Sequence, residues 1–266
     1  MPHSSDTHKG PLGIMLSNLQ ITYLQGHEAI VDKLSMDVPP GQWTCLLGPS
    51  GGGKSTLLKF LAGLLDDQVL WSGELNIYPD SASLKSQVAY MAQQDLLLPW
   101  LTVLDNVLLS RKFADTASGK AEHEGVIEQA KILLEQVGLA EHEQQFPQQL
   151  SGGMRQRVAL ARTLMQDKGV ILMDEPFSAL DAVTRHRLQT LAYELLADKT
   201  VILVTHDPLE AIRLAHNMYI FKGRPSRVEA LSVPINPPPR EYDGECANLQ
   251  QRIMTLLQSA MKGGLQ

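Results

Sequence analysis

The stretch "GPSGGGKST", Gly48–Thr56, decides the fold class of this chain. It fits the pattern G-x-x-x-x-G-K-S and lies between the apolar run "QWTCLL" and a helical run of leucines. Glycines let backbone N–H groups surround phosphates without a Cβ in the way. Lys54 is expected to reach the β- and γ-phosphates of a nucleotide, and Ser55 to bind Mg²⁺. The stretch therefore predicts a nucleotide-binding loop between a strand and a helix.

Apolar strands alternate with helices on both sides of this loop. Strands are expected over residues 14–47 and in "GELNIY", "QVAYMA", "GVILMDEP" and "TVILVTHD". Helical periodicity runs from about 95 to 165, where Thr102 is expected to begin one helix and Gly138 to end another. The alternation predicts an α/β protein with a largely parallel sheet, interrupted by a helical subdomain at about 95–160.

Composition narrows the functional classes. The chain has 266 residues, of which 44% are hydrophobic and 20% charged, which is typical of a globular protein with an ample core. A net charge of −6 gives no support to wholesale nucleic-acid binding. Two cysteines, Cys45 and Cys246, cannot build a disulfide framework, so a reducing, intracellular compartment is favoured. Cys45 is expected in the core.

The two ends of the chain carry weaker patterns. Residues 1–13 lack the apolar segment of a secretory signal and are expected to form a flexible tail. No stretch approaches the roughly 18 apolar residues of a membrane span. Residues 226–266 are expected to form a proline-rich linker followed by an amphipathic helix.

A second stretch, "LSGGMRQRVALAR", begins a predicted helix whose N-terminus is suited to bind an anion. Ser151 is expected to cap this helix, and two glycines leave its backbone open to close approach. Unpaired N–H groups and the helix dipole favour negative charge at such an end. The predicted phosphate loop lies almost a hundred residues earlier, so the local pattern does not say where this anion comes from.

Polar residues end two later apolar strands. Asp174 and Glu175 follow "VILM", and His206 ends "VTH". Asp174 is expected to hold the Mg²⁺ shell, and Glu175 to orient or deprotonate the attacking water. Alone, an acidic pair at a strand end is usually a solvated turn, and such a histidine usually makes a structural hydrogen bond. The phosphate loop in the same chain favours the catalytic interpretation, with His206 contacting the γ-phosphate.

Taken in order, "GPSGGGKST", "LSGGMRQR", "ILMDEPFSALD" and "VTHD" resemble the ATP-binding subunit of ABC transporters. The match runs from about Leu16 to Gly223, and "LSGG" is its specific part, because adenylate kinases and GTPases lack it. The resemblance implies a P-loop NTPase fold: a RecA-like, mostly parallel sheet core, an N-terminal antiparallel β part and an inserted α-helical subdomain, within an ATPase domain over residues 14–225. The implied activity is ATP hydrolysis with Mg²⁺.

The resemblance also assigns roles. Asp174 and Glu175 match the Walker B pair, and Ser178–Asp181 match the D-loop. The implied catalytic residues are Glu175, His206, Gln93 and Lys54, and the implied Mg²⁺ ligands are Ser55, Gln93 and Asp174. The implied nucleotide-binding residues are Tyr23, Gly48, Pro49, Ser50, Gly51, Gly52, Gly53, Lys54, Ser55, Thr56, Ser151, Gly152, Gly153 and Asp181.

Two of these assignments come from position in the motif. Tyr23 falls where the family has an aromatic residue that stacks on adenine. Gln93 falls at the Q-loop glutamine, although "MAQQD" departs from the usual Phe-Gln, so the neighbouring Gln94 remains an alternative.

The resemblance explains the helix that begins at Ser151. In this family two ATP-binding subunits pair head to tail, and each signature helix caps the γ-phosphate bound to the other subunit. Ser151, Gly152 and Gly153 are therefore expected to receive their anion from a partner subunit in an ATP-bound homodimer. Two identical copies are favoured over a pair with a relative, because Glu175 and the signature are both intact in this chain.

The string "DLLLPWLTVLDNV", Asp95–Val107, is similar to that of bacterial importers of nitrate, sulfonate, taurine and pyrimidine precursors of thiamine. Such importers use a separate transmembrane permease and an extracytoplasmic solute-binding protein. The permease is expected to dock near Leu97, Pro99 and Trp100, with the chain peripheral on the cytoplasmic face of the bacterial inner membrane. Local core is the alternative for Trp100.

Other functional classes fit less well. A soluble ABC ATPase acting on DNA or ribosomes is the main alternative, but neither a long heptad insertion nor a second ATPase domain is present. The signature disfavours a P-loop kinase, and an exporter would normally carry fused spans. Residues 226–266 are too short for the regulatory domain of sugar-importer ATPases.

Overall fold

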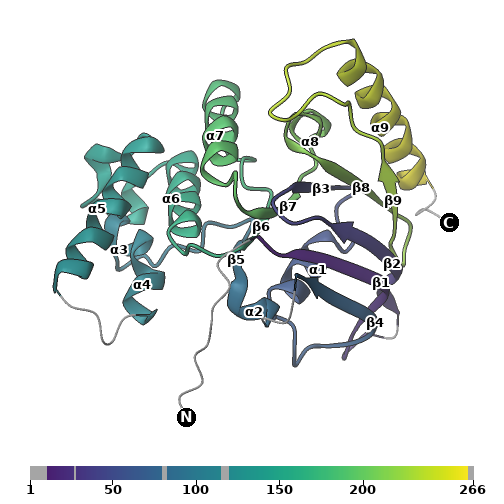
Figure 1. Cartoon of the computed structure of the whole chain (residues 1–266), viewed down its shortest axis with the longest axis horizontal. Coiled ribbons are helices and arrows are strands. Elements are labelled where there is room, and N and C mark those ends of the chain that lie inside the picture. The colour runs from purple at the N-terminus through teal and green to yellow at the C-terminus, as the bar shows by residue number, and fades with distance from the viewer. Residues whose placement is uncertain (1–10, 27, 80–82, 115–119, 263–266) are drawn as a thin grey trace. The chain divides into compact units, whose positions relative to one another are not determined.

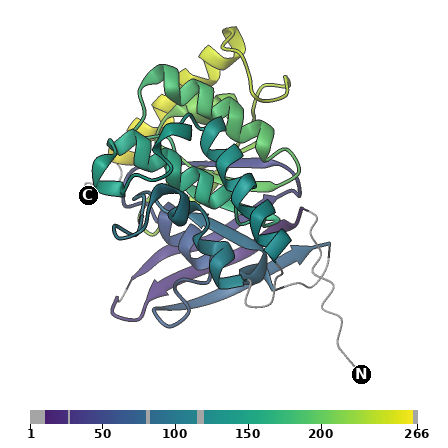
Figure 2. The ribbon, with the colours of Figure 1, turned by 90° about the vertical axis from the view of Figure 1, so that its left-hand side faces the viewer.

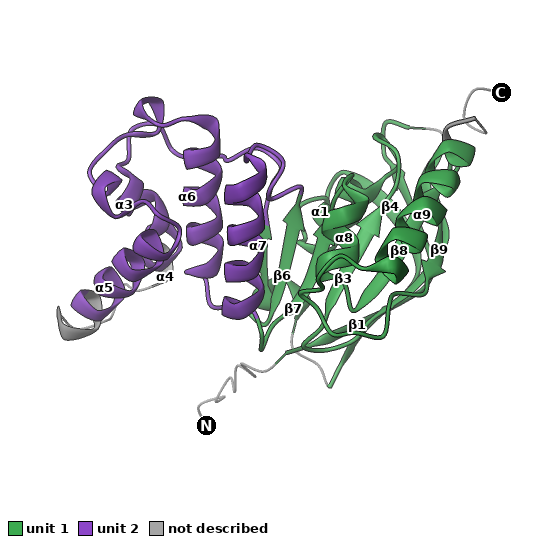
Figure 3. Cartoon of the chain, turned by 90° about the horizontal axis from the view of Figure 1, so that it is seen from above, with its two compact units in different colours: residues 1–90, 168–174, 197–266 green, residues 91–167, 175–196 purple. Residues whose placement is uncertain are grey.

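The computed structural model describes residues 11–26, 28–79, 83–114 and 120–262. The chain divides into two compact units (Figure 3). Unit 1 comprises residues 1–90, 168–174 and 197–266, and unit 2 comprises residues 91–167 and 175–196. Most of the expected N-terminal tail, residues 1–10, lies outside the described residues.

Three long strands at the start of unit 1 form an antiparallel sheet. They are β1 (Gly13–Tyr23), β2 (Ala29–Val38) and β4 (Val69–Tyr78), in the order β2-β1-β4. Figures 1 and 2 both show these purple and blue strands side by side. β1 places Ile14, Leu16 and Ile21 in the core, with Ile14 opposite Val38 on β2. The expected N-terminal antiparallel part is confirmed.

A six-stranded sheet forms the rest of the β structure, in the order β5-β6-β7-β3-β8-β9. β3 runs parallel to β7 and β8, and β6 runs parallel to β7. β3, β6 and β7 are buried at every position, as their continuous apolar runs predict. The strands are β3 (Trp43–Leu47), β5 (Val88–Met91), β6 (Val170–Asp174), β7 (Thr200–Val204), β8 (Asn217–Lys222) and β9 (Arg227–Leu231).

Strand β9 differs from the expectation for this part of the chain. The proline content after residue 225 predicted a linker, whereas residues 227–231 pair antiparallel with β8, Tyr219 opposite Ala230. β9 lies at the edge of the sheet and ends before the prolines of "VPINPPP", which cannot donate to a ladder.

In the described part of unit 1 the helices are α1 (Lys54–Leu61), α2 (Leu84–Gln87), α8 (Pro208–Leu214) and α9 (Gly244–Lys262). Leu57, Leu58 and Leu61 of α1 are buried in the core beneath β6 and β7. α9 lies against α8 (Figure 3). The segment before α9 is anchored by the buried Arg240, whose guanidinium donates to Ile212 O at 2.9 Å, Ala215 O at 2.6 Å and Pro234 O at 3.0 Å.

The described part of unit 2 is built from helices: α3 (Val103–Val107), α4 (Leu109–Ala114), α5 (Lys120–Gln136), α6 (Gly152–Leu164) and α7 (Ala182–Leu195). Thr102 caps α3 by accepting from Asp105 N, and Gly138, with φ 72°, follows α5, as predicted. The single helix expected after Thr102 is interrupted at Leu108, between α3 and α4. Among the residues that the structure describes, no helix combines the length and apolarity needed to cross a membrane.

Candidate active site

The phosphate loop of unit 1 folds around the side chain of Lys54. Its Nζ donates to Gly48 O and Pro49 O, at 2.8 Å each, and only 6% of the residue is exposed. α1 begins directly after Gly53, which has φ 80° and supplies no capping side chain. The loop therefore presents a helix N-terminus and an ammonium group together, which suits a polyphosphate.

Glycine is required in this loop by close packing as well as by conformation. A Cβ on Gly48 would lie 2.8 Å from Phe221 Cβ and 2.9 Å from Phe221 O. A Cβ on Gly53 would lie 3.0 Å from Ile30 Cγ2. Both residues have positive φ, at 150° and 80°. The neighbouring strands β8 and β2 thus hold the loop in a shape that an L side chain would disturb.

Asp174 ends β6 and is 3% exposed. Tyr90, on β5, lies next to it in unit 1: burial, and then the negative charge of Asp174, raise the pKa of Tyr90 to about 12. Within the described residues, the buried Tyr90 hydroxyl has no hydrogen-bond partner. A carboxylate and an orphaned phenol at a strand end fit a site completed by a hydrated Mg²⁺.

The side chains available for a cation are oxygen donors. Ser55 lies in the first turn of α1 and Asp174 ends β6, both in unit 1. No cluster of three or more His, Cys, Asp or Glu occurs among the described residues. This set fits Mg²⁺, which is commonly bound by one or two carboxylates plus substrate phosphates rather than by an all-protein cage.

Glu175 begins a tight turn in unit 2. It has φ 50°, a left-handed conformation that is uncommon outside glycine. Its carbonyl oxygen accepts from Gln156 Nε2 and from Ser178 Oγ, at 3.0 Å each. Its carboxylate Oε2 accepts from Gln93 Nε2 at 3.2 Å. The main chain and the side chain of Glu175 are thus both held by neighbours within unit 2.

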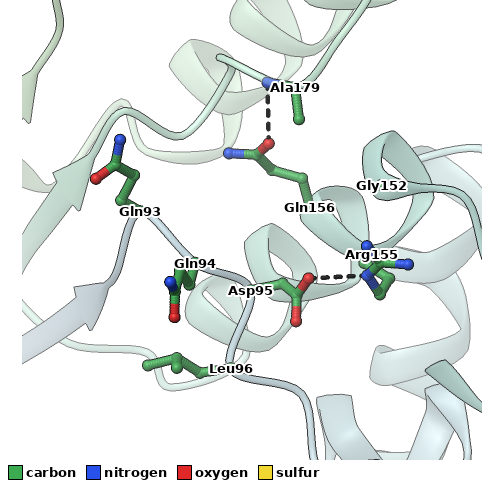
Figure 4. Close-up of a pocket in the computed structure, with 8 residues that line it drawn as sticks. All are labelled: Gln93, Gln94, Asp95, Leu96, Gly152, Arg155, Gln156 and Ala179. Atoms are coloured by element: carbon green, nitrogen blue, oxygen red, sulfur yellow. Dashed lines mark hydrogen bonds and ion pairs between the residues drawn. The ribbon is translucent and has the colours of Figure 1, made fainter. Parts of the chain in front are cut away.

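A cavity of about 370 Å³ lies beside this turn (Figure 4). Arg155 Nε donates to Asp95 Oδ2 at 2.9 Å across it, and Arg162 donates to Asp95 O and Leu96 O. These bonds attach the loop after β5 to α6. The cavity is lined by Gln93, Gln94, Asp95, Leu96, Gly152, Arg155, Gln156 and Ala179.

The helix α6 begins as the sequence predicts. Ser151 is exposed, and its Oγ accepts from Met154 N at 3.3 Å. The first turn carries no acidic residue, so the positive end of the helix is not neutralised from within it. A Cβ on Gly153 would lie 3.3 Å from Ala179 O, so this glycine allows residues 175–181 to approach α6 closely.

The other predicted residues lie at element ends. Tyr23 is half-buried at the end of β1, and His206 is exposed just after β7, both in unit 1. Asp181 is exposed and caps α7 in unit 2, accepting from Thr184 N at 3.0 Å. That bond and others nearby lower the pKa of Asp181. Thr56 is half-buried in α1.

The loop expected to dock a permease is shaped by Asn106, which is fully buried. Asn106 Oδ1 accepts from Leu98 N at 2.8 Å, and Nδ2 donates to Leu98 O, Leu101 O and Thr102 O. Pro99 and Trp100 are exposed, Trp100 by 69%. Leu97 is buried, so it packs inside unit 2 and is not part of the exposed surface expected from the sequence.

Sequence reasoning missed one residue of this arrangement. Gln156 is 6% exposed, and its amide bonds to Glu175 O and to Ala179 N. Its partners lie 19 and 23 residues away. A glutamine on a helix is ordinarily a solvated residue, so no local pattern singled it out.

Known proteins are similar to this chain along most of its length. A family model described as "ABC transporter" matches residues 31–178. A protein of Haemophilus influenzae named "Uncharacterized ABC transporter ATP-binding protein" is 45% identical over 231 residues, covering 85% of this chain and 92% of that protein. The Pseudomonas aeruginosa "Aliphatic sulfonates import ATP-binding protein SsuB 1" is 40% identical over 253 residues, covering 92% and 98%.

One further relative and one solved structure are similar. The Rhodococcus jostii "Aliphatic sulfonates import ATP-binding protein SsuB 2" is 43% identical over 212 residues, covering 79% of this chain and 80% of that protein. The dimeric ATP-binding cassette MJ0796, in a post-hydrolysis state bound to ADP and Pi, superposes with a TM-score of 0.71 at 29% identity. That match covers 86% of this chain and 100% of the other.

Proposed function

Because this chain belongs to the ABC transporter family, as one of its ATP-binding proteins, we propose that it powers a bacterial importer of a small solute. The chain is an ABC transporter ATPase. The proposed solute belongs to the sulfonate, nitrate, taurine or thiamine-precursor pyrimidine class. The proposed place of work is the cytoplasmic face of the cell membrane.

The observation that carries the importer proposal is the exposed Trp100. Contiguous exposed apolar patches commonly mark contact sites, and Trp100 is exposed next to the exposed Pro99. The four hydrogen bonds of Asn106 hold the loop so that Pro99 and Trp100 face outward while Leu97 packs inside. We assign this surface to the permease, and the names of two similar proteins, both sulfonate import ATP-binding proteins, support an importer.

The proposed chemistry is attack of water on the γ-phosphate of ATP. The phosphate loop amides and Lys54 hold the phosphates, and Tyr23 stacks on adenine. Ser55, Asp174 and Gln93 are the proposed Mg²⁺ ligands. When bound, Mg²⁺ offsets the charge that develops on the phosphate oxygens.

Two residues are proposed to act on water and on the transferred phosphate. Glu175 orients the attacking water and accepts its proton, while His206 contacts the γ-phosphate. The carboxylate of Glu175 is held by Gln93 at 3.2 Å, which supports Gln93 over Gln94 as the glutamine of this site.

The proposed power step is pairing of two copies around ATP. Ser151, Gly152 and Gly153 would cap a γ-phosphate bound by a second copy, with Asp181 close to the same nucleotide. The first turn of α6 carries no acidic residue, so no carboxylate there neutralises the positive end of the helix, which supports this role. ATP then holds the dimer together, and hydrolysis releases the two copies. The γ-phosphate thus controls the change between the paired and the separated state.

Purification of the tagged chain from gently solubilised native membranes tests this proposal. We expect a multi-span permease to co-purify, and a solute-binding protein from the same complex to be stabilised thermally by sulfonates, nitrate or pyrimidines. Recovery of ribosomes or DNA-processing proteins alone would overturn the importer assignment and favour the soluble ABC ATPase.

A further inference from the structure

We infer that Gln156 is a positioning residue for Glu175, because its amide ties both ends of the turn 175–179 to the helix that begins at Ser151. This inference rests on the proposed catalytic role of Glu175. It assigns a function to a buried side chain that neither the phosphate loop nor the LSGG pattern accounts for.

The amide of Gln156 uses both of its ends. Nε2 donates to Glu175 O at 3.0 Å. Oε1 accepts from Ala179 N at 3.2 Å, the bond drawn in Figure 4. The residue is 6% exposed, so water does not compete freely for these bonds. Loss of the bond to Ala179 would remove this partner from its main-chain N–H, and loss of the bond to Glu175 would leave the Glu175 carbonyl with Ser178 alone.

The turn that Gln156 holds carries conformational strain at Glu175. A non-glycine residue at φ 50° persists only where its surroundings over-determine it. The Glu175 carbonyl accepts from Gln156 and from the Ser178 hydroxyl, which together hold its peptide. Since the peptide sets the direction of the Cβ, it also sets where the Glu175 carboxylate points.

A second contact joins the same two segments. Gly153, in the first turn of α6, leaves room for Ala179 O at only 3.3 Å from where its Cβ would be. The first turn of α6 and the turn 175–179 thus touch directly, and Gln156 connects them one turn further along the helix. A shift of α6 that accompanies capping of a partner's phosphate would therefore reach the Glu175 peptide through Gln156.

Steady-state ATP hydrolysis by Gln156→Met and Gln156→Glu tests the inference. Gln156→Met keeps the length of the side chain and removes both bonds, whereas Gln156→Glu keeps the acceptor for Ala179 and loses the donor to Glu175. We expect kcat to fall about tenfold or more in both variants, with KM and nucleotide binding by the single chain unchanged. The matched control is Gln149→Glu, since Gln149 is exposed and its Oε1 accepts from Phe146 N, a bond that glutamate retains.

A double substitution separates positioning from a general loss of structure. If Gln156 acts through Glu175, adding Gln156→Met to Glu175→Gln should lower the residual turnover no further. Additive losses, or wild-type kcat in both single variants, would overturn the inference. If Gln156→Met does not fold, the Gln156→Glu comparison with its control decides the question alone.

The proposed function fails separately from this inference. Absence of ATP-dependent turnover in the wild-type chain would remove the catalytic proposal itself. Normal wild-type turnover combined with unaffected Gln156 variants would remove only the positioning role.

Discussion

The side-chain amide of Gln93 donates a hydrogen bond to Oε2 of Glu175 at 3.2 Å. A carboxylate can only accept, so this bond turns the nitrogen of the amide toward Glu175 and the oxygen away from it. The orientation suits both proposed roles, because the oxygen is the atom that would bind Mg²⁺ and the nitrogen holds the proposed base.

Replacing Glu175 with glutamine should nearly stop turnover while nucleotide still binds. The amide has the same shape but cannot accept the proton of water, and a positioned general base typically contributes ~10²-fold or more in rate. The measurement is ATP hydrolysis together with gel filtration in ATP, where a persistent dimer is expected. Turnover at the wild-type rate would remove Glu175 from the role.

Ser151→Arg should abolish ATP hydrolysis and leave nucleotide binding by the single chain nearly normal. The exposed Ser151 begins α6, and a long cationic side chain there would block the phosphate of a second copy. Titration with a fluorescent nucleotide at low protein concentration measures single-chain binding. Ser259→Arg, at a serine on α9 that is also exposed, is the control and should be neutral. Loss of nucleotide binding by the single Ser151→Arg chain would contradict the proposal that Ser151 caps a phosphate bound by a second copy.

Gly48→Ala should destabilise unit 1 and weaken nucleotide binding. Its Cβ would lie 2.8 Å from Phe221 Cβ, and its φ of 150° is strained for alanine. We expect the free energy of unfolding to fall by about 1–3 kcal/mol, as measured by urea unfolding. Gly125→Ala is the matched control, because nothing lies within 4 Å of its Cβ on α5, and alanine there should stabilise the helix by about 0.5–1 kcal/mol. Equal stabilities of the two variants would contradict the packing argument.

Trp100→Ala should abolish capture of the permease while basal ATP hydrolysis by the chain alone stays unchanged. Trp100 is 69% exposed and is not one of the proposed catalytic residues, so its removal is expected to reduce the contact area for a partner. Trp71→Ala, at a tryptophan that is 50% exposed on β4, is the control and should capture the permease normally. Capture by both variants would assign the permease contact to another surface.

Asn106→Ala should lower the free energy of unfolding by about 3 kcal/mol, since four main-chain groups would lose a buried partner. Thermal unfolding checks this change. Asn76→Ala, at an exposed position on β4, should shift stability by less than about 0.5 kcal/mol. A neutral Asn106→Ala would mean that the loop keeps its shape without this side chain.

Neither cysteine should react with Ellman's reagent at pH 8 in the folded protein. Burial raises the pKa of the Cys45 thiol well above its usual value, and burial also raises the pKa of Cys246. Both shifts lower the fraction of reactive thiolate. Addition of denaturant should release both thiols to the reagent, and rapid labelling of the native protein would contradict their burial.

The sequence by itself determined the features that depend on residues close together in the chain. Thr102 and Ser151 cap helices because each side chain needs only the amide three residues on. Gly138 follows α5 because glycine adopts a positive φ at little cost. The phosphate loop is equally local, with its glycines, Lys54 and the start of α1 all within one short stretch.

Only the tertiary structure decided the features that join distant segments. Residues 227–231 form strand β9 because they pair antiparallel with β8, despite the prolines that follow. Trp100 faces outward and Leu97 inward because Asn106 holds the loop between them. Gln156 bonds to Glu175 and Ala179 because the packing of α6 brings these segments together. A sequence pattern does not show which main-chain groups 19 or 23 residues away will need a hydrogen bond.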